Sequence, residues 1–313
     1  MKIAHISDLH LSRIFKRHNI RKTKRLIKYC IEQGFDHLVI TGDISDNSEE
    51  KDFSILRNIL SNFNLLDSSK VSITIGNHDI FGGVQTALDI VNFPSKCLKT
   101  NYEEKVKTFA SYFYELFEGA IFPNKNKMFP YAKTIGDTTI LGINSIDVYS
   151  RIKNPFASNG KIYTEDFEAI KALLEYDSIK EKRKIVAVHH HFYKNSVEAT
   201  SSQSHLWNRI EGYTLKLRGK KKLLKLFKEN NVDLVLHGHS HELKEYFRKG
   251  IRFINAGATI DNHTHSEAHV FFINLLKDRI SVQLKTLPES VLIGSAEKIR
   301  TAFVPSFAGK TAL

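Results

Sequence analysis

Polar side chains that can bind metal ions follow five short apolar runs of the sequence. The sets are Asp8-Leu9-His10, Gly42-Asp43, Gly76-Asn77-His78-Asp79, His189-His190-His191 and Gly238-His239-Ser240-His241. Carboxylate, amide and imidazole groups together suit divalent ions such as Mn, Fe or Zn, whereas all-oxygen sets suit Mg or Ca. Two such ions held close together can activate a nucleophile and polarise a phosphoryl group. These residue types therefore indicate a metal site with hydrolytic chemistry.

Each polar set comes directly after a β-branched run of strand length. The runs are Lys2–Ser7, His37–Thr41, Val71–Ile75, Lys184–Val188 and Val232–Leu236. Runs of this composition are typical of buried strands. Between these runs, four segments have apolar residues at helical spacing and are predicted to be helices: Ile20–Gln33, Asp52–Leu66, Thr164–Tyr176 and Gly219–Asn230. Alternation of strand and helix predicts parallel pairing, which would bring all five sets to one rim at the carboxyl ends of the strands.

Further strand patterns predict a second, more antiparallel sheet. They are Thr138–Asn144, Leu243–Phe247, Ile251–Asn255, His269–Leu275 and Ile280–Leu287. We therefore expect an α/β fold with two sheets packed face to face and helices outside. The segment 81–133 interrupts the pattern directly after His78, and we expect it to form a helical cap with a helix near Tyr102–Phe117. Residues 1–288 are predicted to form one catalytic domain, followed by a C-terminal arm at 289–313.

The five motifs, in this order, resemble those of the calcineurin-like metallophosphoesterase superfamily over residues 1 to about 260. The resemblance implies an αββα two-sheet sandwich with a dinuclear metal centre. It also implies which residues act. Asp8, His10 and His241 would bind one metal; Asn77, His239 and one of the 189–191 histidines would bind the other; Asp43 would bridge; His78 would donate to the phosphoryl or leaving oxygen; and Asp79 would orient the His78 ring.

The fourth motif leaves two candidate ligands. Many relatives follow this histidine with a proline at fixed spacing, whereas here Phe192 and Tyr193 follow the run. If Phe192 stands where that proline would be, His190 is the ligand, and we expect this choice; counting to the aromatic residue instead gives His189. Neighbouring residues at a strand end point to opposite faces, so both histidines are not expected to reach the same ion.

The predicted function is hydrolysis of a phosphodiester or phosphomonoester by a metal-bound hydroxide, with His78 assisting. Two divalent ions, Mn, Fe or Zn, are the expected cofactors, and a small anionic phosphoester is the expected substrate. The chain resembles the compact phosphodiesterases of the superfamily more than the calcineurin-type protein phosphatases. The alternatives are a DNA exonuclease, a nucleotide-sugar lipid pyrophosphatase and a non-enzymatic scaffold with a degenerate site. The presence of every expected ligand type argues against the scaffold.

The net charge of +12 and the pI of about 9.4 indicate a surface that attracts anions. Nucleic acid is a possible partner that the sequence does not favour, because the basic run Lys216–Lys228 carries Leu223, Leu224 and Phe227 at the spacing of an amphipathic helix. A second basic run, from Arg13 to Arg25, follows the first motif. This run could hold a second anionic group of the substrate, although a charged helix face would look the same.

Cysteine spacing and the lack of long apolar runs indicate the cellular compartment of the protein. Cys30 and Cys97 have no disulfide or CxxC spacing. No signal-like start and no apolar run near the roughly 20 residues of a membrane span are present, so we expect a soluble cytoplasmic protein. The oligomeric state does not follow from the sequence.

Four polar residues outside the five motifs have less specific expectations. His5 and His37 are expected to be core or edge histidines, while Asn144 and Ser145 would either support the site or make an ordinary turn.

Overall fold

Two mixed sheets form the centre of the molecule in the computed structural model, which describes residues 1–193, 216–260, 267–288 and 291–292. The first sheet has the order β13-β12-β1-β2-β3 and the second β10-β11-β9-β7-β5-β4. The strands of the first sheet are β1 (Lys2–Ile6), β2 (His37–Thr41), β3 (Val71–Thr74), β12 (Glu267–Leu275) and β13 (Ile280–Pro288). Those of the second are β4 (Tyr131–Ile135), β5 (Thr138–Ile143), β7 (Arg183–Val188), β9 (Val232–His237), β10 (Leu243–Arg248) and β11 (Ile251–Ala256). A short pair, β6 (Gly160–Lys161) and β8 (Leu217–Arg218), lies apart from both.

The division of strands between the sheets differs from the sequence prediction. The strands before the five polar sets were expected at one rim of one parallel sheet, but β1, β2 and β3 belong to one sheet and β7 and β9 to the other. The predicted meander is also split, because β11 pairs in parallel with β9 while β12 pairs antiparallel with β1. The second sheet therefore has a parallel middle and antiparallel edges, whereas the first is antiparallel at the β12 and β13 end and parallel through to β3, and the polar sets come from both.

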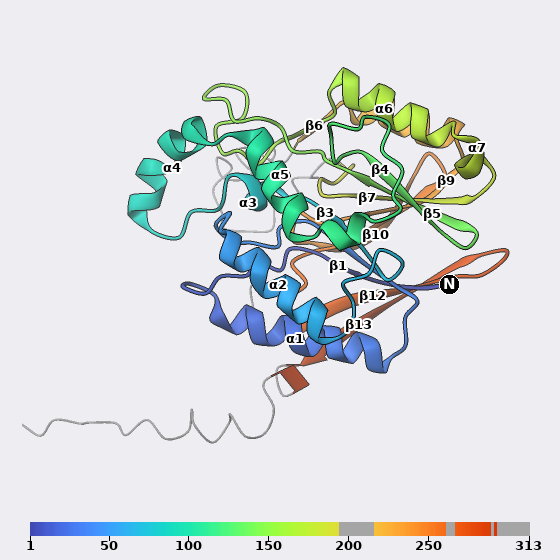
Figure 1. Cartoon of the computed structure of the whole chain (residues 1–313), viewed down its shortest axis with the longest axis horizontal. Helices are drawn as coiled ribbons and strands as arrows, with labels where there is room; N and C mark the ends of the chain where they lie inside the picture. The colour runs from blue at the N-terminus through green and yellow to red at the C-terminus, as the bar shows by residue number, and fades with distance from the viewer. Residues whose placement is uncertain (194–215, 261–266, 289–290, 293–313) are drawn as a thin grey trace, which may run out of the picture.

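Helices cover the outer faces of the two sheets. On one side lie α1 (Arg17–Glu32) and α2 (Glu50–Asn62), and on the other lie α6 (Thr164–Leu174), α7 (Asp177–Lys180) and α9 (Lys220–Glu229); α1 and α2 are seen opposite α6 in Figure 1. Apolar residues from both sheets meet between them, including Ile3, Val39, Ile185 and Leu234. Separate apolar clusters lie beneath α1 and α2 and beneath α6 and α9. The αββα sandwich is therefore confirmed.

The segment between β3 and β4 is largely helical. It contains α3 (Asn77–Ile80), α4 (Ala87–Lys99), α5 (Tyr102–Tyr112) and the 3-10 turn η1 (Tyr114–Phe117). The helix predicted near Tyr102–Phe117 is present as α5 and η1. Phe109 of α5 packs edge-on against Phe53 of α2, with ring centroids 5.5 Å apart. A capping role for this segment stays a prediction, as do the domain boundaries.

The predicted C-terminal arm lies almost wholly outside the described residues. Only Val291 and Leu292 of the range 289–313 are described, so the arm stays a prediction. Within the described part of the chain, no helix combines the length and the apolar character that crossing a bilayer requires.

Candidate metal centre

The loops that carry the polar sets share an unusual backbone conformation. Five non-glycine residues have positive φ angles there: Asp8 at 52°, His10 at 43°, Asp43 at 50°, His239 at 74° and His241 at 55°. Such conformations are uncommon outside glycine, cost on the order of 1–3 kcal/mol each, and cluster at functional sites. The surrounding structure must therefore hold these five residues in place.

Backbone hydrogen bonds between the first two loops provide part of that support. The Asp8 N–H donates to the Gly42 carbonyl at 3.1 Å, and the His10 N–H donates to the Asp43 carbonyl at 3.0 Å. From α1, the buried Asn19 amide donates to the His10 carbonyl at 3.1 Å. Hydrogen bonds therefore connect α1 to the loop that carries Asp8 and His10, and connect that loop to the one that carries Asp43. These loops, and those of the other three motifs, are called the metal-type loops below.

One group of donor atoms joins the first motif to the last. His10 Nε2 lies 3.2 Å from His241 Nε2, and His241 Nε2 lies 3.7 Å from Asp8 Oδ1. One ligand atom from each of these residues falls within 4.8 Å of the others. The Asp8 carboxylate also accepts the His239 N–H at 3.1 Å. This arrangement brings together the three residues expected at the first metal.

A second group lies beside the first and comes from both sheets. His189 Nε2 is 3.1 Å from Asn77 Oδ1 and 3.1 Å from His239 Nδ1. Asp43, His189 and His239 are all buried and again fall within 4.8 Å of one another. The ends of β2, β3, β7 and β9 thus meet at one place between the sheets.

Asp43 lies between the two groups. Its Oδ2 is 3.3 Å from His189 Nε2 and 4.0 Å from His10 Nε2, while its Oδ1 accepts the His78 N–H at 2.8 Å. Burial alone would raise the pKa of Asp43, but the neighbouring His189 and His78 hold it well below its usual range. Burial alone would lower the pKa of His189, but the Asp43 carboxylate raises it to about 9. Asp43 is therefore ionised and faces imidazoles of both groups.

The structure places His189, and not the expected His190, beside Asp43. His190 Nδ1 lies 2.8 Å from Ser145 Oγ, and His190 Nε2 lies 3.2 Å from the Ser158 carbonyl, so both ring nitrogens have partners away from Asp43. His189 points the other way, with Nδ1 donating to the Thr41 carbonyl at 2.8 Å and Nε2 beside Asn77. Adjacent residues at the end of β7 face opposite sides, so only one of these two histidines faces Asp43.

The predicted role of Asp79 is also corrected. Its carboxylate accepts N–H groups of Ile44 and Ser45, both at 2.9 Å, and of Gly76 at 2.8 Å. Because Asp79 is the third residue of α3, its side chain turns back to the helix start, as in a capping box. The His78 ring is oriented instead by the Asp46 carbonyl, which accepts from Nδ1 at 2.9 Å. Asp79 braces the loops, and the Asp46 main chain orients the ring.

Asp46 is a site residue that the sequence reasoning missed. It is fully buried, with Oδ1 2.8 Å from Lys16 Nζ and 3.6 Å from His10 Nδ1. Among the described residues, Asp46 Oδ2 and His10 Nδ1 have no hydrogen-bond partner, and Asp46, His10 and His78 form a third candidate group. A second aspartate three positions after Asp43 was the available signal.

Glycine is required where the last motif approaches the first. A Cβ atom on Gly238 would lie 2.0 Å from Ser7 Oγ and 2.1 Å from Asp8 Oδ2. Atoms cannot approach so closely, so any larger residue would push His239 and Asp8 apart. The Gly-His-Ser-His motif therefore needs its glycine for packing.

The donor set fits divalent metal ions. Burial lowers the pKa of both His10 and His239 well below its ordinary value, so these imidazoles are neutral and present lone pairs at neutral pH. Together with the ionised Asp43, they provide mixed nitrogen and oxygen donors, which suit intermediate divalent ions. The residues Asp8, His10 and His241 form one group that could hold a metal ion, and Asp43, His189 and His239 form another.

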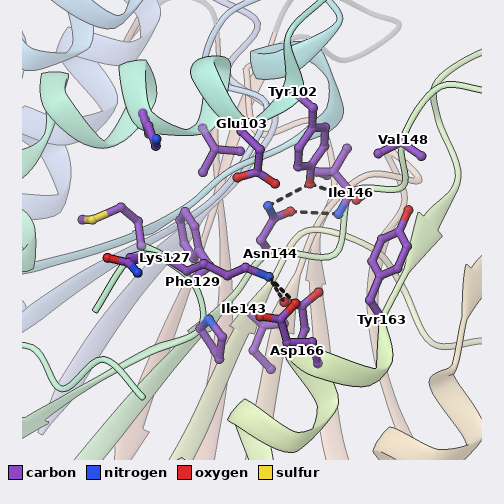
Figure 2. A pocket seen from close by; sticks show the side chains of 16 residues that line it. Tyr102, Glu103, Lys127, Phe129, Ile143, Asn144, Ile146, Val148, Tyr163 and Asp166 are labelled. Atoms are coloured by element: carbon purple, nitrogen blue, oxygen red, sulfur yellow. Dashed lines mark hydrogen bonds and ion pairs between the residues drawn. The ribbon is translucent and has the colours of Figure 1, made fainter. Parts of the chain in front are cut away.

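A separate cavity of about 420 Å³ lies beyond the end of β5, between α5 and α6. Figure 2 shows Asn144 pointing into it, where its amide donates to the Tyr102 hydroxyl at 2.9 Å. Lys127 crosses the cavity to Asp166, 3.6 Å away. Ser145 holds His190, as described above. The polar partners of Asn144 and Ser145 therefore lie outside the two metal-type groups.

Comparison with known proteins gives the family and the fold. The sequence model of the calcineurin-like phosphoesterase family matches residues 1–243. No curated protein sequence matches the chain. A dimetal phosphatase from Danio rerio has a similar structure, with a TM-score of 0.60 at 13% identity over 93% of this chain and 99% of that one. A purple acid phosphatase from yellow lupin is similar over 94% of this chain and 55% of its own, with a TM-score of 0.50 at 13% identity.

These two structures are too distant in sequence to say more than that the fold is shared. The family match covers most of the chain and includes all five motifs. The chain therefore belongs to the calcineurin-like phosphoesterase family and is a metal-dependent phosphoester hydrolase.

Proposed function

We propose that the chain binds two divalent ions side by side and hydrolyses a phosphoester with His78 as the proton donor. The residues that would hold the ions are Asp8, His10 and His241 for the first, Asn77, His189 and His239 for the second, and Asp43 for both. The position of Asp43 supports this proposal most directly, because its Oδ2 adjoins His189 of one group and His10 of the other. When bound, two such ions would lower the pKa of a water molecule and polarise the phosphoryl oxygens.

The hydrogen bond to the Asp46 carbonyl determines how His78 could act. A carbonyl only accepts, so His78 Nδ1 carries the proton in this bond. Nε2 is then the nitrogen left for substrate, and it donates only when the ring carries a second proton. His78 would therefore transfer its Nε2 proton to the leaving oxygen as the ester bond breaks.

The remaining residues of the site would position these groups. Asp79 holds the backbone of the second and third motifs together through three N–H bonds. Lys16 offsets the charge of Asp46 at 2.8 Å, and the α1 residue Asn19 fixes the first loop.

Metal analysis combined with a substrate panel tests the proposal. The panel contains a phosphomonoester, an aryl phosphodiester, a glycerophosphodiester, a nucleotide pyrophosphate and single-stranded DNA, each with Mn and with Zn. We expect turnover of at least one small ester, and for an ester with an alkyl leaving group a His78→Ala variant should keep its metal but lose about 10²–10⁴-fold in kcat. Protein with neither bound metal nor turnover would instead support the scaffold alternative, and turnover of DNA alone would support the exonuclease.

A further inference from the structure

A groove of about 730 Å³ lies between the loop that follows the first motif, the first turn of α1 and the start of α2. Among the charged residues of its lining, basic side chains outnumber acidic ones. Arg13, Arg17, Arg21 and Lys51 line it together with two acidic residues, Glu49 and Asp52. Asp52 is buried and its carboxylate accepts the Ser45 hydroxyl at 2.9 Å, so it is engaged away from the groove. The groove therefore presents an excess of positive charge.

The groove adjoins the candidate metal centre. Asn47, one of its lining residues, directly follows Asp46, whose carbonyl orients His78. A neighbouring cavity of about 200 Å³ shares Asn47 and Phe15 with the groove and is also lined by Gly83. A Cβ atom on Gly83 would lie 2.6 Å from His78 Cε1. Gly83, in the lining of the second cavity, therefore adjoins the His78 ring.

Hydrogen bonds hold the groove and the metal-type loops in one unit. Leu11 N–H donates to the Ile44 carbonyl at 2.7 Å, and Asp46 N–H donates to the Leu11 carbonyl at 2.9 Å. Ser12 Oγ accepts the Phe15 N–H at 3.1 Å and shapes the next turn. A ligand group bound in the groove would therefore be held at a fixed position relative to the metal centre.

Three of the four basic residues of the groove are available to an anion. Arg13, Arg17 and Lys51 are exposed, and in the described ranges no carboxylate oxygen lies within 4.0 Å of their charged groups. Arg17 Nε donates to the Arg13 carbonyl at 2.7 Å, and this hydrogen bond orients the Arg17 guanidinium. The first turn of α1 contains no acidic residue, so the positive end of the helix dipole adds to this charge.

We infer that the groove binds a second phosphate group of the substrate, so that the enzyme acts on a small phosphoester carrying another phosphate beyond the scissile one. This inference rests on the proposed function of the metal centre. Guanidinium groups bind phosphate through paired, charge-assisted hydrogen bonds. The exposed Phe15 lies between the two cavities and offers an apolar face to the organic part that joins the two phosphates.

A matched pair of substrates tests this inference. The first is the p-nitrophenyl ester of thymidine 5′-phosphate, and the second is the same ester with an added 3′-phosphate. We expect the second to have a kcat/KM on the order of tenfold higher, with the advantage falling as salt is raised. In an Arg17→Ala/Lys51→Ala variant the ratio should fall to about one, while kcat/KM for the first ester is unchanged. A Lys221→Ala/Lys225→Ala variant, which also removes two positive charges but from exposed lysines of α9, is the charge-matched control and should keep the preference.

Binding measurements separate failure of the groove from failure of the catalytic proposal. On the metal-loaded protein, thymidine 3′,5′-bisphosphate should bind about tenfold more tightly than thymidine 5′-phosphate, and the double variant should lose this difference. A preserved binding difference without turnover of either ester would count against the catalytic proposal alone. Equal binding and equal kcat/KM in the wild type would overturn the groove assignment. A single-stranded oligonucleotide preferred over the bisphosphate would overturn the small-molecule assignment.

Discussion

A Gly83→Ala substitution should displace His78 without removing any side chain of the metal-type groups. Gly83 N–H donates to the Asp46 carbonyl at 2.8 Å, the same oxygen that accepts from His78 Nδ1 at 2.9 Å. A Cβ atom at position 83 would lie 2.6 Å from His78 Cε1, whereas ordinary contacts begin at 3.4 Å. The ring must therefore move by the difference, about 0.8 Å, and the bond from Nδ1 lengthens or breaks.

The size of the expected effect follows from this displacement. A misplacement of about 1 Å at a reacting group can reduce the rate about 10²-fold. We therefore expect kcat for an alkyl phosphoester to fall about 10²-fold in Gly83→Ala, with the bound metal unchanged. A p-nitrophenyl ester should lose much less, because p-nitrophenolate leaves without being protonated.

Steady-state kinetics with both esters and metal analysis of the same protein measure this effect. Gly83→Ala should cost little further in a His78→Ala background, because the ring that the added Cβ atom would displace is already absent. Equal losses for the alkyl and aryl esters, or loss of metal, would refute the assignment of His78 as the proton donor.

Three further predictions address other parts of the molecule. His189→Asn should reduce the amount of metal that the protein binds and lower kcat about 10³-fold, whereas His190→Asn should keep its metal. Metal analysis that shows the reverse would indicate that His190 is the ligand. Burial lowers the pKa of His37 from 6.5 to about 3. Between pH 7 and pH 5 the unfolded chain therefore binds a proton at His37 that the folded chain does not. This difference should lower the free energy of unfolding by about 2 kcal/mol from pH 7 to pH 5. Urea titrations at both pH values should show a correspondingly smaller fall for His37→Gln. Lys133 is buried and donates to the carbonyls of Ser68, Val71 and Leu116, so Lys133→Ala should lower the free energy of unfolding by about 3 kcal/mol, and a change under 1 kcal/mol would contradict this role.

The strands and their polar ends could be predicted from the sequence because each depends on local chemistry. Five β-branched runs ending in metal-binding side chains mark both the strand and the point where it stops. The pairing of strands could not be predicted, because a hydrophobic pattern shows that a strand is buried but not which neighbour it pairs with. Thus Ala4 of β1 pairs opposite Phe272 of β12, a contact between distant parts of the chain.

The finer placement of the site depended on orientation and tertiary contacts. His189 and His190 have the same chemistry, and only the direction in which β7 ends decides which one faces Asp43. Asp79 follows His78 in sequence, but its side chain turns back to accept three N–H groups. Asp46 is buried at the site beside Lys16, the residue that directly precedes α1. The spacing of residues in the sequence does not show in which direction these side chains point.

The proposed pair of ions is tested most directly by a crystal structure of the metal-loaded protein with anomalous scattering recorded for Mn or Zn. We predict two anomalous peaks roughly 3.5–4 Å apart on either side of Asp43, one beside His10 and His241 and the other beside His189 and His239. A single peak, or peaks away from Asp43, would contradict the dinuclear site.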